Sequence, residues 1–197
     1  MTPVSSPFIL ASASPRRRDL LSQIGIIPDH IIAPEIDETP HRGEVPAHYA
    51  RRMATEKAEA AARMGPPDGA VILAGDTVVA CGRSILPKTE DADAARACLE
   101  RLSGRRHRVY GGIALRCADG RMITRLVTSI VTIKRLSAVE IDRYIDSGDW
   151  QGKAGGYAIQ GPAAAFVQHV SGSYSNIVGL SLYDVAAMLG GNGLLPE

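Results

Sequence analysis

Hydrophobic and polar residues recur along the chain with two periods, and together they predict a mixed α/β fold. Three short apolar runs predict strands, at residues 7–12, 30–33 and 70–80. The Ala-rich stretch 46–64 predicts a long helix, because Pro46 stands at its start and Gly65 follows its end. A further helix is predicted from Pro15 to Gly25.

The second half of the chain is richer in β-branched residues and predicts a hairpin. Residues 107–117 and 122–136 are its strands, and Asp119-Gly120 between them is a favoured turn sequence. Three helices are predicted: 89–104 with Thr89 as N-cap, 137–148 with a Ser137/Glu140 capping box, and 181–191. Residues 155–161 and 164–170 are predicted as strands, followed by a loop at 171–176. Without repeats or a linker, we expect one domain over 1–197, divided into two lobes.

Composition adds two exclusions. The 22 Lys+Arg and 21 Asp+Glu give a net charge of +1, and two Phe and one Trp offer little stacking surface, so a nucleic-acid binder is disfavoured. No stretch of about 18 apolar residues is present, so no membrane span is expected. Three widely spaced cysteines, Cys81, Cys98 and Cys117, predict reduced thiols rather than disulfides or zinc, which favours a cytoplasmic protein.

The start of the first predicted helix has an unusual charge. Ser14 and Pro15 suit an N-cap and a first helical position, yet Arg16, Arg17 and Arg18 follow. Cations are unfavourable at this end by about 0.3–1 kcal/mol each, because the helix dipole is positive there. Arginines beside free backbone N–H groups indicate an anion site. Helical spacing lets at most two of the three arginines reach one ligand. The alternative is a solvated basic face.

Asp76 is the second unusual residue, because it interrupts an apolar strand. A buried carboxylate needs a partner, so Asp76 should face a cleft, a metal or an arginine. It could hold Mg²⁺ or accept a proton from water. The alternative is that it ends the strand beside Gly75 and caps the turn that follows.

Other charged residues carry weaker signals. Glu35, Asp37 and Glu38 form an acidic turn that could simply be solvated, and Lys57 and Lys88 taken singly resemble solvated lysines. Two lone histidines, His107 and His169, are given no role, and the serines of GSYSN have no base near them in sequence. Arginine for phosphate, carboxylates for a divalent cation and lysines for further phosphate together suit hydrolysis of a phosphoanhydride.

Seven stretches taken in order resemble the motifs of the Maf family of nucleoside triphosphate pyrophosphatases. They are LASASPRRRDLL, EIDE, ATEKA, AGDTVV, LSGRRHRVY, KAGGYAIQG and GSYSNIVGL. The resemblance runs from about Phe8 to Leu189. It implies an α/β fold with a mixed sheet and two lobes around a central cleft, related to ITPase-like folds and often dimeric, so a homodimer is one expectation. It also implies divalent-metal-dependent hydrolysis of a nucleoside triphosphate to the monophosphate and pyrophosphate.

The resemblance also assigns residues. It places Ser12, Ser14, Arg16 and Arg17 in the phosphate-binding turn. It places Glu38, Lys57, Asp76 and Lys88 along the cleft. Asp76 is then the general base that activates water for attack at the α-phosphorus, and Glu38 with Asp76 holds Mg²⁺ or Mn²⁺. The two lysines offset triphosphate charge, Arg17 binds phosphate, Arg16 lies near the base or ribose, and Arg18 is left to solvent.

Three positions resemble the branch of the family that acts on dTTP and UTP: Arg16, Thr77 and Gln160. A Gln amide can pair with the donor–acceptor edge of thymine or uracil. The related branch that prefers 7-methyl-GTP carries Trp, Gln and Glu there. We therefore expect an enzyme that removes dTTP, UTP or modified pyrimidine triphosphates from the nucleotide pool. The alternative is a nucleotide-binding regulator of septum formation with little turnover.

Three departures from the family pattern concern loops. The usual G-K-P around the second lysine reads Pro87-Lys88-Thr89, an acid is lost at Gly152, and Ser181 replaces a Pro. They affect the expected loop geometry and rate, not the reaction class.

Overall fold

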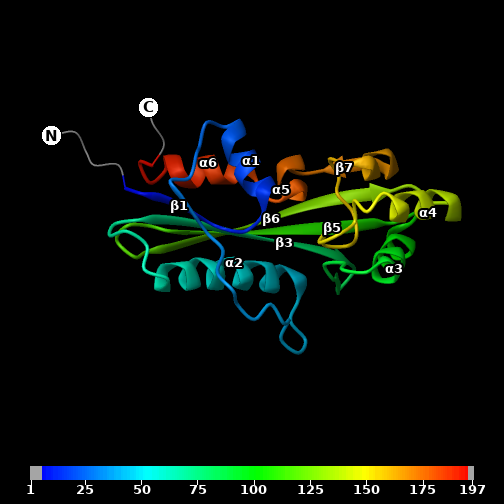
Figure 1. Ribbon diagram of the computed structural model, residues 1–197, viewed down its shortest axis with the longest axis horizontal. Helices are drawn as coiled ribbons and strands as arrows, with labels where there is room; N and C mark the ends of the chain where they lie inside the picture. Colours follow the sequence, from blue (N-terminus) through cyan, green and yellow to red (C-terminus); the bar gives the residue numbers. More distant parts are fainter. Residues whose placement is uncertain (1–5, 195–197) are drawn as a thin grey trace.

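A seven-stranded mixed sheet forms the centre of the computed structural model, which describes residues 6–194 (Figure 1). Its order is β2 (His30–Ile32), β1 (Phe8–Ala11), β3 (Val71–Cys81), β5 (Arg106–Arg116), β6 (Met122–Ile133) and β7 (Val167–Ser171), with β4 (Ser84–Leu86) paired to the end of β3. The strand β1 is parallel to β2 and β3, and the other pairs are antiparallel. The predicted α/β class with a mixed sheet is confirmed.

Helices cover both faces of the sheet (Figure 1). The long helix α2 (Pro46–Arg63) lies on one face. On the other lie α1 (Pro15–Gln23), α5 (Tyr174–Val178) and α6 (Leu182–Gly190). At one end of the sheet, α3 (Ala92–Leu102) packs against α4 (Ala138–Asp146), and a 3₁₀ turn, η1 (Pro162–Phe166), leads into β7.

The strand β3 belongs to several parts of the core. Leu73 packs in the cluster that contains α1 and α6, and Ala74 packs beneath the alanines of α2. Farther along, Val79 joins the cluster that contains α3 and α4. The polar pair Asp76-Thr77 lies between these apolar stretches, in the middle of the strand.

Two glycines in β5 allow neighbouring elements to come close. A Cβ on Gly112 would lie 2.0 Å from the carbonyl oxygen of Ala50 in α2, and a Cβ on Gly111 would lie 1.8 Å from Oδ1 of Asn176 in α5. Contacts this short are excluded for real side chains, so a Cβ at either position would force backbone or a buried amide to move. The Gly-Gly pair thus lets helices approach β5 from both faces.

Most elements predicted from the sequence are present. The hairpin pairs Arg116 with Met122, and Gly120 adopts φ +84° in its turn. The capping box of α4 is complete, with Ser137 and Glu140 each accepting a backbone N–H. The three cysteines carry free thiols. No helix within residues 6–194 has the length and apolarity needed to cross a bilayer.

Several local predictions are wrong. Asp91, not Thr89, caps α3, since its carboxylate accepts the N–H of Ala94 at 2.7 Å. Residues 155–161 form a turn-rich loop instead of a strand, because Gly155 and Gly156 both adopt positive φ.

Two segment boundaries and one cap also differ from prediction. Residues 164–166 belong to η1, so strand pairing begins only at Val167. The predicted loop 171–176 contains the start of α5, whose N-cap Ser173 accepts the N–H of Asn176. At α1, Ser14 occupies the N-cap position as predicted, but its side chain makes no capping hydrogen bond.

Candidate active site

A cavity of about 370 Å³ opens where the start of α1, the middle of β3 and the loop after residue 151 meet. Five cationic side chains line it, those of Arg16, Arg17, Lys57, Lys88 and Lys153. Two carboxylates oppose them, Glu38 and Asp76, leaving an excess of three positive charges. Such a concave, positively charged surface suits a polyanionic ligand.

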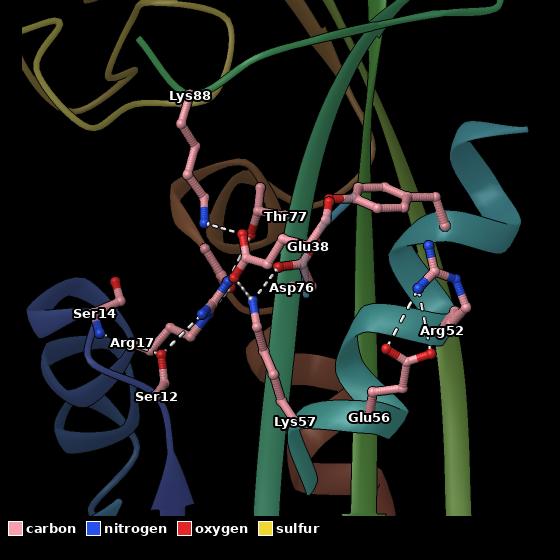
Figure 2. A network of polar contacts seen from close by, with 12 residues as sticks. Ser12, Ser14, Arg17, Glu38, Arg52, Glu56, Lys57, Asp76, Thr77 and Lys88 are labelled. Carbon is pink, nitrogen blue, oxygen red and sulfur yellow. Dashed lines mark hydrogen bonds and ion pairs between the residues drawn. The ribbon is translucent and has the colours of Figure 1, made fainter. Parts of the chain in front are cut away.

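Arg17 points into the protein at the floor of this cavity (Figure 2). Its Nε donates to the carbonyl of Gly179 at 2.9 Å, Nη1 to Ser12 Oγ at 2.8 Å, and Nη2 to Thr77 Oγ1 at 3.2 Å. Burial lowers the pKa of Arg17, and the charge of Asp76 acts in the opposite direction. These three bonds fix the orientation of the guanidinium.

The three arginines of α1 separate as helical geometry requires. Arg17 is buried, Arg16 is half-buried, and both line the cavity. Arg18 is exposed, and among the residues described its one ion pair is with its neighbour Asp19, at 3.6 Å. The solvated-face interpretation therefore holds for Arg18 and is wrong for Arg17.

Ser12 and Ser14 lie in the turn that joins β1 to α1 (Figure 2). Ser12 is buried, and its Oγ also accepts the backbone N–H of Ser14 at 3.2 Å. Ser14 lines the cavity at the first turn of the helix. This turn brings the positive end of α1 to the cavity wall.

Asp76 and Glu38 are bridged by one lysine (Figure 2). Nζ of Lys57, reaching inward from α2, lies 2.7 Å from Asp76 Oδ1 and 2.8 Å from Glu38 Oε1. Nζ of Lys88 approaches Glu38 Oε2 at 2.6 Å from the opposite side. These contacts join side chains from α2, β3 and two loops into one chain of alternating charge.

This arrangement decides several of the alternatives left open by the sequence. Asp76 is paired with Gly112 in mid-strand, so the interpretation of a strand-end cap is wrong. Lys57 is 8 % exposed, so it is not a solvated lysine. In the acidic turn, Glu35 and Asp37 are exposed, whereas Glu38 lines the cavity.

Glu38 is held ionised by its surroundings. Burial raises the pKa of its carboxyl, but hydrogen bonds and charge from Lys57 and Lys88 outweigh that effect and lower the pKa to about 2. A carboxylate in this state is available to a cation throughout the neutral range.

The unusual Pro87-Lys88-Thr89 stretch has a structural explanation. Thr89 is fully buried, and its Oγ1 donates to the carbonyl of Trp150 at 2.8 Å. Its carbonyl accepts the N–H of Gly152 at 2.8 Å. Gly152 has φ +65°, a conformation that disfavours an acidic side chain there. The altered residues thus hold the Lys88 segment against the neighbouring loop.

The three positions expected to mark the subfamily are divided between two parts of the cavity. Thr77 lies on its floor, where it contacts Arg17 and donates to Gly179 at 3.3 Å. Gln160 is exposed on the loop that borders the cavity, and Arg16 lines the cavity from α1.

Sequence reasoning gave no role to two side chains that line the cavity, those of Lys153 and Tyr157. Lys153 adds a fifth cation, and Tyr157 supplies an aromatic wall. The hydroxyl of Tyr157 is 2.7 Å from Nε2 of His107, which is buried in β5 and was given no role. A buried His inside an alternating strand was the available signal, because it requires a polar partner.

The carboxylates fit a divalent cation only in partnership with a ligand. No group of three or more His, Cys, Asp or Glu side chains suited to a metal occurs in residues 6–194. However, Glu38 and Asp76 already hold one cationic group between them, the Lys57 ammonium. Mg²⁺ commonly takes one or two carboxylates together with substrate phosphates. The pair therefore suits a cation shared with a phosphate ligand.

Comparison with known proteins adds a family and close relatives. The family model described as Maf-like protein matches residues 7–191. A protein of Paramagnetospirillum magneticum named dTTP/UTP pyrophosphatase is 60% identical over 96% of this chain and 98% of its own. Another protein of that name, from Rhodospirillum rubrum, is 58% identical over 98% of this chain and 90% of its own.

Solved structures of Ham1 proteins share the fold at low identity. The Staphylococcus aureus Ham1 protein is 16% identical with a TM-score of 0.55, covering 94% of this chain and 98% of its own. A HAM1 protein from Coxiella burnetii is 18% identical with a TM-score of 0.53, covering 93% and 98%.

Proposed function

The chain belongs to the Maf family, and from that membership we propose that it hydrolyses dTTP and UTP to the monophosphate and pyrophosphate. Close relatives that align with this chain over nearly their whole length are named for that activity. The single observation that carries the proposal at the site is the charged chain formed by Lys88, Glu38, Lys57 and Asp76 beside buried Arg17. It combines phosphate-binding cations with carboxylates in one cavity.

The triphosphate binds across the start of α1. Arg17, Ser12 and Ser14 contact phosphate oxygens there, supported by the positive end of the helix. Lys57 and Lys88 neutralise the remaining charge from the opposite side. Electrostatic stabilisation of this kind supplies much of the catalysis in phosphoryl transfer.

Asp76 is the general base. Its carboxylate accepts a proton from the water that attacks the α-phosphorus, and the bond between that phosphorus and the oxygen bridging to the β-phosphate breaks as pyrophosphate leaves. Burial at 5 % exposure shields Asp76 from bulk water, and Lys57 fixes its orientation at 2.7 Å.

Glu38 and Asp76 would hold Mg²⁺ or Mn²⁺ together with the phosphates. The ion supplies charge neutralisation on the phosphoryl oxygens and orients the leaving group. If both carboxylates took the ion, the ammonium of Lys57, which lies 2.7 and 2.8 Å from them, would exchange at least one of these ion pairs for phosphate.

The base is recognised at the rim. Gln160 presents an amide that can match the donor–acceptor edge of thymine or uracil, and Arg16 lies beside the base or ribose. Thr77 acts farther in, through its contact with Arg17. Modified pyrimidine triphosphates would fit the same edge, and membership of the family favours a homodimer.

A panel of triphosphates with Mg²⁺ or Mn²⁺ tests the proposal. We expect pyrophosphate to be released from dTTP and UTP. The kcat/KM for purine triphosphates and for 7-methyl-GTP should be well below the value for these two substrates. Asp76→Asn protein purified in the same way controls for contaminating phosphatases. Release of orthophosphate, or preference for 7-methyl-GTP, would contradict the proposal. A protein that binds dTTP without turnover would instead favour the regulator of septum formation, which the names of the relatives do not support.

A further inference from the structure

Glu38 lies on a segment that has no regular secondary structure. Residues 33–45 connect β2 to α2 without a helix or strand. Lys57 and Lys88 bind the carboxylate of Glu38, but they contact only its side chain. The backbone that carries Glu38 must therefore be held by other groups.

Two side chains of α2 hold that backbone. The hydroxyl of Tyr49 donates to the carbonyl of Glu38 at 2.6 Å. Nη2 of Arg52 donates to the next carbonyl, that of Thr39, at 3.1 Å. Tyr49 and Arg52 lie three positions apart, on the same side of the helix. The Arg52 guanidinium carbon lies 5.4 Å from the centre of the Tyr49 ring.

Arg52 is itself fixed by a bidentate ion pair. Its Nε and Nη2 lie 2.8 and 2.7 Å from the two carboxylate oxygens of Glu44. Its Nη1 lies 3.3 Å from Glu56, as Figure 2 shows. Oε2 of Glu44 also accepts the backbone N–H of His41 at 2.9 Å, which links two residues of the 33–45 segment. The side chains of Arg52 and Glu44 are 19% and 10% exposed. A sheltered fork–fork pair of this kind is geometrically rigid.

We propose that Tyr49, Arg52 and Glu44, here called the Arg52 clamp, set the position of Glu38 for catalysis. The inference rests on the function proposed above for Glu38. None of the three clamp side chains lines the cavity, so they act as positioning residues. Figure 2 shows the separation: Arg52 and Glu56 lie on the outer side of α2, whereas Lys57 points toward Asp76 and Glu38.

Arg52→Met tests the clamp, because it removes every hydrogen bond of the guanidinium and keeps the aliphatic stem. Removing a group that orients a metal ligand typically costs about 10- to 100-fold in activity or metal affinity. We expect a fall in kcat of that size and a higher Mg²⁺ requirement, with KM for dTTP changed far less. Arg52→Lys keeps the charge without the fork and should recover activity in part.

Arg51→Ala is the matched control. Arg51 is the neighbouring arginine on the same helix, and its side chain is exposed. This variant should keep the wild-type kcat and the wild-type Mg²⁺ requirement.

A double-mutant cycle separates positioning from general stabilisation. If Arg52 acts through Glu38, Arg52→Met should cause little further loss in a Glu38→Gln background. Tyr49→Phe should behave in the same way with a smaller loss, since it removes one hydrogen bond to the Glu38 carbonyl. The same fold-loss in both backgrounds would overturn the proposal.

A readout independent of activity keeps the clamp distinct from the proposed function. Amide hydrogen exchange of residues 38–44 should be at least 10-fold faster in Arg52→Met than in Arg51→Ala, while exchange in β3 stays unchanged. Equal exchange rates would overturn the clamp even if the enzyme is active. If the wild-type protein hydrolyses no triphosphate while the two variants still differ in exchange, the proposed function and the catalytic part of this inference are overturned.

Discussion

Asp76 is the residue on which the proposed chemistry depends most directly. Asp76→Asn removes the basic oxygen and keeps the size of the side chain. Because a general base typically contributes 10²–10⁴-fold to the rate, we expect kcat to fall by about that factor while dTTP still binds. Pyrophosphate release and calorimetric binding measure the two effects. Asp68→Asn, in an exposed loop, is the control, and retained turnover in Asp76→Asn would exclude the role as base.

His107 carries a prediction about pH. Burial lowers its pKa from 6.5 to about 4. Well above pH 6.5 the ring is neutral in both the folded and unfolded protein and contributes no pH dependence. Between pH 6.5 and 4 the unfolded chain binds a proton that the folded protein does not, so the free energy of unfolding falls with decreasing pH, by about 3 kcal/mol in total.

Urea unfolding at a series of pH values measures this slope. His107→Gln should remove it while offering Tyr157 a polar partner, and His169→Gln, exposed on β7, should leave it unchanged. An unaltered slope in His107→Gln would show that other groups cause the acid sensitivity.

At the scale of elements, the close approach of α2 to β5 depends on Gly112. A Cβ there would lie 2.0 Å from a backbone carbonyl of α2, so the helix would have to move. We expect Gly112→Ala to lower the free energy of unfolding by about 3 kcal/mol or more, the upper range for overpacking. Displacing α2 would also displace Lys57, so activity should fall as well.

Gly82→Ala separates this steric effect from backbone strain. Gly82 has φ +62° and no heavy atom within 4 Å of its missing Cβ. Its replacement should cost about 1 kcal/mol through conformation alone. Chemical denaturation measures both variants, and equal losses would argue against close packing at Gly112.

The elements whose ends carry local signals were predictable from the sequence. The helix α2 has Pro46 at its start, and the hairpin of β5 and β6 has Asp119-Gly120 at its turn. The loop 155–161 was not predictable, because its apolar residues resemble a strand until the positive φ of Gly155 and Gly156 is known. Thr89 failed as a predicted cap for a related reason: its hydroxyl serves a distant segment at Trp150.

The site was predictable in its residue types and not in its pairings. Asp76 stood out because an acid interrupts an apolar strand. Nothing local shows that Lys57, 19 residues earlier, is its partner, because tertiary packing of α2 on β3 brings them together. The Arg52 clamp was invisible for the same reason, as its charges resemble an ordinary solvated helix face.

The whole molecule should unfold as one unit, and we propose that it is a single domain. The long strands β3, β5 and β6 run from one part of the core to another, as Leu73 and Val79 show for β3. For 197 residues we expect a single calorimetric transition of about 140 kcal/mol near 60 °C, equal to the van't Hoff enthalpy. Two transitions, each with a fraction of that enthalpy, would indicate separately folding lobes.

The continuity of β3 also bears on how nucleotides enter and leave. Asp76 lies in the middle of a strand that is hydrogen-bonded to a neighbour on each side, to β1 over its first part and to β5 along nearly its whole length. Bending it there would break ladder hydrogen bonds to β5, so we expect the floor of the cavity to be stiff. If the proposed nucleotide binds here, we therefore expect it to enter and leave past the bordering loop, residues 152–161, and not through bending of β3.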